Sequence, residues 1–263
     1  ITALFQMMKK WTIRISVFVA ACFGVLLLIG FPFAEFFAYA NHQISPESGR
    51  NGTFKRYRSS QEVDVYHLGT IHGDHLESKG FHLGHLEAVI RNLKPTHLMV
   101  EIRPEDLKVG NLAQSPVEMP VATFLARKDG IPVHAIDWWQ AGGSGTNSVR
   151  DDQMFANFQR VVPSTGRVLI LTGFSHVLEF KPRFAQAGFV EVPMDSETKN
   201  ALFQGATTPF RFPNGLAEAL QASLSHVKAL VDAEKDPEYR KTLERVMNRT
   251  QRRIAMIKGS VLH

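Results

Sequence analysis

Strand-like and helix-like segments alternate between residues 61 and 195, and this alternation limits the folds open to the chain. Short runs of β-branched and apolar residues are each followed by a segment whose apolar residues recur every three or four positions. The pattern predicts, in order, strand 64–70, helix 83–93, strand 97–102, helix 120–128, strand 131–136, a helix beginning at 148, strand 168–172, helix 176–187 and strand 189–192.

Strands and helices that alternate in this way form an α/β fold with a largely parallel sheet and helices on both faces. We therefore expect residues 61–195 to form an α/β core. In such sheets, ligands bind beyond the carboxyl ends of the strands. Functional residues are expected at that edge.

The segments on either side of this core differ from it in composition. Residues 41–60 are polar and contain Pro46, Gly49 and Gly52, which predicts a linker. Residues 196–263 are expected to form a C-terminal helical extension. Its apolar residues recur at helical spacing in two successive stretches, which predicts a helical hairpin.

The N-terminal residues 1–40 contain an uncharged apolar run, residues 15–34, preceded by Lys9, Lys10 and Arg14. Such a run is about as long as a membrane-spanning helix, and its basic flank predicts a cytoplasmic N-terminus. The ending Ala38-Tyr39-Ala40 is instead typical of a signal-peptidase site, with cleavage near Ala40. A transmembrane anchor and a cleaved signal peptide both stay open. Either would make the rest of the chain extracytoplasmic, membrane-anchored in the first case and secreted or periplasmic in the second.

The cysteine content excludes a cysteine-based site, and the distribution of charge argues against a nucleic-acid partner. The single cysteine, Cys22, lies in the apolar run, so the folded domain has neither a disulfide nor a catalytic thiol. The net charge of +5 is concentrated in residues 237–263, which carry seven Lys or Arg residues against two Glu residues. The basic character therefore belongs to the tail and the N-terminus, and we expect no nucleic-acid partner.

Two Gly-x-x-His tetrapeptides stand at the ends of predicted strands. Gly69-Thr70-Ile71-His72 ends the first strand, and Gly173-Phe174-Ser175-His176 ends the fourth. The glycine permits a tight turn and leaves room for a substrate. A single histidine in this position is often a helix cap or a hydrogen-bonded core residue, but two of them favour a shared site.

Glu101 and Arg150 are the next candidates. Glu101 directly follows the second strand, where a carboxylate beside imidazoles would be a metal ligand or a general base. A salt bridge to Arg103 or to Arg150 is the structural alternative. Arg150 opens a helix after a glycine-rich loop, and its fork of donors suits an oxyanion or a carboxylate.

Three other polar residues have simpler interpretations. Asp137 ends the third strand and is a secondary candidate, whereas Asp151 is explained as a carboxylate at a helix N-terminus. His75 would either join His72 at a metal site or be a loop residue. No Gly-x-Ser-x-Gly elbow, P-loop or His-Glu-x-x-His motif occurs, so a serine hydrolase or a phosphate-binding loop has no support.

Four of these motifs, in this order, resemble the TraB/PrgY–TIKI–GumN group, which is related to the erythromycin esterases and to the haem-binding ChaN-like proteins. The resemblance covers about residues 61–195. Its motifs are residues 69–72, Lys94-Pro95 before a strand that ends in Val100-Glu101, the stretch 150–157, and residues 173–176.

This resemblance implies an α/β core with two histidines and a glutamate in one cleft, and His72, Glu101, Arg150 and His176 match these positions. In TIKI-like members the cleft is a metal-dependent protease site, and in the esterase branch it hydrolyses a macrolide lactone. The chain departs from the GumN-type members, because it lacks their aromatic and lysine markers after the second strand. The segment between Glu101 and Arg150 is also short for a substrate lid.

We therefore expect an extracytoplasmic hydrolase of an ester, lactone or peptide bond. His72, His176 and Glu101 would hold a divalent metal (Mn, Co or Zn) or activate water directly, while Arg150 would stabilise the developing oxyanion. The expected partners are a small-molecule or peptide substrate and, through the N-terminal segment, the membrane. The alternative is a non-enzymatic protein whose histidines bind haem or another ligand, or which sequesters a peptide signal.

Overall fold

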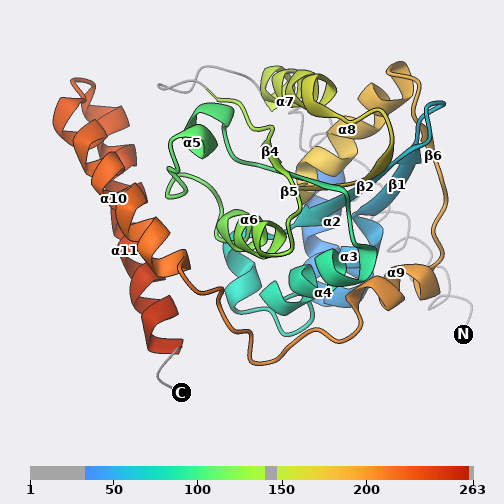
Figure 1. Ribbon diagram of the computed structural model, residues 1–263, viewed down its shortest axis with the longest axis horizontal. Coiled ribbons are helices and arrows are strands. Elements are labelled where there is room, and N and C mark those ends of the chain that lie inside the picture. The colour runs from blue at the N-terminus through green and yellow to red at the C-terminus, as the bar shows by residue number, and fades with distance from the viewer. Residues whose placement is uncertain (1–32, 140–146, 261–263) are drawn as a thin grey trace, which may run out of the picture. The chain divides into compact units, whose positions relative to one another are not determined.

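The computed structural model describes residues 33–139 and 147–260 (Figure 1). The chain divides into two units, residues 1–37 and residues 38–263, and all six strands belong to the second. The expected membrane or signal segment, apart from Phe33 and Ala34, lies outside the described residues. None of the described helices combines the length and the apolar character needed to cross a membrane.

A six-stranded sheet forms the centre of the second unit, with the strand order β4-β3-β5-β2-β1-β6. The strands β4, β3, β5 and β2 are parallel to their neighbours, whereas β1 is antiparallel to both β2 and β6. A largely parallel sheet was predicted, and it is confirmed. The strand bounds are β1 Phe54–Arg58, β2 Val63–Thr70, β3 His97–Val100, β4 Val133–Ala135, β5 Gly166–Gly173 and β6 Val190–Glu191.

Two separate apolar cores lie on the two faces of this sheet, because successive side chains of a strand point to opposite faces. One core is closed by α4 (Leu83–Leu93) and α6 (Glu118–Lys128). The other is closed by α7 (Asn147–Val161) and α8 (Phe174–Gln186). Helices therefore cover both faces, as the alternation of segments predicts.

The expected linker at residues 41–60 is wrong. These residues contain the end of α2 (Phe33–Ile44), the helix α3 (Pro46–Gly52) and the strand β1. Phe54 and Tyr57 are almost fully buried, one in each core. Two apolar residues three positions apart point to opposite faces of a strand, so β1 shows no simple alternation in the sequence.

The predicted C-terminal hairpin is confirmed, since α10 (Leu216–Ala233) and α11 (Pro237–Ser260) pack against each other. Ser223 of α10 accepts a hydrogen bond from the backbone of Leu112, and Arg253 of α11 donates one to the carbonyl oxygen of Ser115. The hairpin is therefore fastened to the segment before α6. The remaining elements are η1 His72–Leu76, α5 Pro104–Lys108 and α9 Ser196–Phe203.

Candidate functional site

The two Gly-x-x-His tetrapeptides lie side by side, because β2 and β5 are neighbouring parallel strands in which Thr70 is paired with Gly173. A Cβ atom on Gly69 would lie 2.7 Å from the Cα of Phe174. A Cβ atom on Gly173 would lie 2.7 Å from Nε2 of His72. Each glycine is thus packed against the other tetrapeptide, and a methyl group at either position would push the two apart.

Glu101 lies at the centre of the site and is almost fully buried, with 2 % of its surface exposed. Its Oε2 accepts the backbone N–H of Gly173 at 2.6 Å, and its Oε1 accepts Nη2 of Arg150 at 2.6 Å. Nε2 of His176 lies 3.6 Å from the same Oε1. Burial opposes ionisation of Glu101, but the nearby positive groups outweigh it and hold the pKa of this carboxyl well below its ordinary value.

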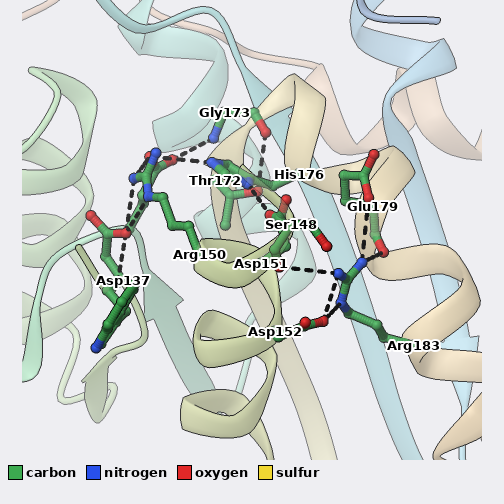
Figure 2. A network of polar contacts seen from close by, with 12 residues as sticks. Asp137, Ser148, Arg150, Asp151, Asp152, Thr172, Gly173, His176, Glu179 and Arg183 are labelled. Atoms are coloured by element: carbon green, nitrogen blue, oxygen red, sulfur yellow. Dashed lines mark hydrogen bonds and ion pairs between the residues drawn. The ribbon is translucent and has the colours of Figure 1, made fainter. Parts of the chain in front are cut away.

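Arg150 connects Glu101 to a second acid, Asp137, which follows β4. Its Nε donates to Oδ1 of Asp137 at 2.9 Å, and Figure 2 shows the guanidinium lying next to this carboxylate. The salt bridge between Glu101 and Arg150, considered above as the structural alternative, is therefore present. Burial and the neighbouring charge of Glu101 raise the pKa of Asp137, although Arg150 opposes this shift.

His176 is held by Asp151, whose carboxylate accepts a short hydrogen bond from Nδ1 of the imidazole (Figure 2). Asp151 is buried within α7 and points to α8, so its position near a helix N-terminus does not explain it fully. Burial disfavours a charged imidazole, but the hydrogen bonds to Asp151 and Glu101 outweigh it and raise the pKa of His176 to about 9.

His72 is held in the same manner by Glu118. Nδ1 of His72 lies 2.8 Å from Oε1 of Glu118, which also accepts the hydroxyl of Thr70 at 2.6 Å. The backbone of His72 has φ +52°, a left-handed conformation that a non-glycine residue rarely adopts. Burial works against its charge, but the hydrogen bond to Glu118 and the charges of Glu118 and Glu101 raise the pKa of His72.

Glu118 is the site residue that sequence reasoning missed. It is fully buried at the start of α6, and within the described residues its Oε2 has no hydrogen-bond partner. A glutamate in the first turn of a helix is ordinary, so its position alone gave no reason to single it out. The one signal is its apolar neighbourhood, Met119-Pro120-Val121, because a glutamate beside buried residues needs a partner.

The structure places His72, Glu101, Arg150 and His176 near one another. It joins to them Asp137, the secondary candidate, Asp151, which had a helix-terminus explanation, and Glu118, which the sequence did not indicate. His75 has a structural role instead. Its Nε2 accepts the N–H of Ile71 and its Nδ1 donates to the carbonyl oxygen of Phe81, so both ring nitrogens are occupied.

His72 and His176 share one feature, which is that Nδ1 of each imidazole contacts a carboxylate. The other ring nitrogen, Nε2, is therefore the one that can act in the site. Metal-binding histidines have this arrangement, and so do catalytic histidines that transfer protons. No group of three or more His, Cys, Asp or Glu side chains within residues 33–139 and 147–260 has the geometry of a metal site.

The fold and the site together define an α/β protein with a buried histidine–carboxylate cluster at the carboxyl edge of its sheet. Comparison of the chain with protein-family models, with curated proteins and with solved structures finds no match. The resemblance to the TraB/PrgY–TIKI–GumN group therefore stays a prediction that rests on the four sequence motifs.

Proposed function

We propose that the chain is a hydrolase that cleaves an ester, lactone or peptide bond at the cluster of His72, Glu101 and His176. The observation that carries this proposal is the pair of histidines that are each fixed at Nδ1 by a buried carboxylate. Nε2 of His176 lies 3.6 Å from the buried Glu101, and His72 is close enough for its charge to lower the pKa of Glu101. A cluster that served only to stabilise the fold would not need two oriented imidazoles, because burying charged groups costs free energy.

The types of donor atom fit a divalent metal ion. Two histidines and one glutamate form the ligand set of several hydrolytic zinc enzymes. The ion pairs of the cluster involve four carboxylates, Glu101, Glu118, Asp137 and Asp151, and one guanidinium, that of Arg150. When both imidazoles are neutral, these groups leave 4 − 1 = 3 negative charges. His72, His176 and Glu101 would hold the ion, which would supply Lewis acidity and lower the pKa of water.

The side chains of the protein have separate roles in this proposal. Glu118 and Asp151 keep each histidine in the tautomer that presents Nε2 to the reaction. Arg150 is fixed through Nε and Nη2, so its remaining N–H groups would donate to the carbonyl oxygen as negative charge develops there. His72 has 45 % of its side chain exposed, so it is the member of the cluster best placed to exchange a proton with solvent.

The proposal is tested with the purified full-length chain and a panel of p-nitrophenyl esters, lactones and fluorogenic peptides. We expect hydrolysis of at least one class, loss of the activity with a chelator, and its return when Mn²⁺, Co²⁺ or Zn²⁺ is added. The purified protein should hold roughly one such ion per chain. A haem absorption band with no hydrolysis would favour the ligand-binding alternative.

A further inference from the structure

A hollow of about 590 Å³ lies between α11 and the segment after β4, outside the histidine–carboxylate cluster. Pockets for small organic ligands usually have volumes of about 300–1,000 Å³. We call this hollow the α11 pocket, and its main lining residues are Gln114, Trp139, Tyr239, Arg245, Arg249 and Arg252.

Three arginines of α11 form the cationic side of the pocket. Arg245, Arg249 and Arg252 are spaced by four and three residues, so they lie on one face of the helix. None of them forms a hydrogen bond or an ion pair with the described residues, and no acidic side chain is among the described lining residues. The charge of Arg249 is partly balanced by the nearby buried Glu118. Three arginines on one helix face still repel one another, and a bound anion would relieve this repulsion.

Two aromatic side chains also line the pocket. The rings of Trp139 and Tyr239 meet edge to face with their centroids 6.5 Å apart. The guanidinium of Arg103 lies 3.9 Å from the centre of the Trp139 ring and is held by Asp106 at 2.6 Å. The indole is therefore fixed as a flat apolar surface before any ligand binds, which lowers the entropy cost of binding.

A buried donor completes the pocket. Nε2 of Gln114 is buried and has no acceptor within the described residues. An unsatisfied buried N–H costs free energy, and a ligand oxygen would satisfy it.

We propose that the α11 pocket binds a small organic anion with a flat apolar body, such as an aromatic carboxylate. The carboxylate would accept hydrogen bonds from the arginines, which form paired donors of the required geometry, and the aromatic body would stack against Trp139. This binding does not depend on hydrolysis at the cluster, so it can be measured without any turnover.

The test is calorimetric titration of the full-length chain, in nonionic detergent, with 2-naphthoate and with the neutral analogue 2-naphthalenemethanol. We expect one naphthoate site per chain and binding of the alcohol weaker by about tenfold or more, because hydrogen bonds to charged groups contribute strongly. A variant with Arg245→Gln, Arg249→Gln and Arg252→Gln should lose naphthoate binding by a similar factor. Equal binding of the acid and the alcohol would overturn the proposal.

The matched control removes three positive charges outside the pocket. Lys235→Gln, Lys241→Gln and Lys258→Gln change exposed residues in and next to the same helix, so this variant should bind naphthoate within about twofold of the wild type. If this control variant loses naphthoate binding as the arginine variant does, the attraction is only nonspecific.

Trp139→Leu should weaken naphthoate binding without a change of charge, and unchanged binding would also contradict the proposed pocket. Arginine-dependent sedimentation with phosphatidylglycerol vesicles, in the absence of naphthoate binding, would assign this face to a membrane surface instead.

Discussion

Buried histidines in this chain are of two kinds, and the difference lies in their partners. His72 and His176 each have a carboxylate at Nδ1 and an increased pKa. His67 of β2 is also fully buried, but it has no carboxylate partner among the described residues. Its Nε2 contacts the hydroxyl of Thr172 on β5, and its Nδ1 has no hydrogen-bond partner within the described residues. Burial, together with the nearby charge of His176, lowers the pKa of His67 to about 3. His67 is therefore a neutral core residue.

The neutral state of His67 predicts acid sensitivity. The unfolded chain takes up a proton at this residue below about pH 6.5, whereas the folded chain does so only near pH 3. The contribution of His67 to stability is therefore fully present above pH 6.5 and is lost as the pH falls. Between pH 7 and pH 4.5 the wild type should lose about 3 kcal/mol more of its free energy of unfolding than a His67→Leu variant. Urea denaturation at both pH values measures this, and equal losses in the two proteins would contradict it.

At the scale of elements, the contact between the two strand ends positions the site. A Cβ atom on Gly173 would meet the ring of His72, whereas a Cβ atom on Gly73 would have no atom within 4 Å. Gly173→Ala should therefore displace His72 and lower kcat by about 100-fold, a loss typical of misplaced catalytic groups. Gly73→Ala is the matched control and should keep near-wild-type activity on the substrate found with the panel. Similar activities of the two variants would show that the close contact is not needed.

The sequence was sufficient to predict the central elements, because their periodicity is local. The strands that carry the Gly-x-x-His motifs and the helices that follow them were located from spacing alone, and their shared sheet edge follows from parallel topology. The strand β1 was missed, since Phe54 and Tyr57 face different cores. Glu118 was missed because its contact with His72 depends on the packing of α6 against η1, which no sequence pattern reports.

At the scale of the whole molecule, the prediction that still depends on sequence alone is the extracytoplasmic position of residues 41–263. Lys9, Lys10 and Arg14 before the apolar run favour an N-terminus in the cytoplasm. Alkaline phosphatase fused after His263 should therefore be active, and green fluorescent protein at the same position should not fluoresce. The reverse result would place the cluster in the cytoplasm and would require a cytoplasmic substrate.

The central claim is that Glu101 lies at the centre of a hydrolytic site, and the kcat of Glu101→Gln tests it most directly. Glutamine has nearly the same shape but removes the charge that attracts His72, His176 and Arg150. We expect kcat to fall by about 1,000-fold or more on the substrate found with the panel, while circular dichroism shows an intact fold. Glu105→Gln, a change at a glutamate whose side chain is 65 % exposed, should leave kcat unchanged. A folded Glu101→Gln protein with the activity of the wild type would contradict the account.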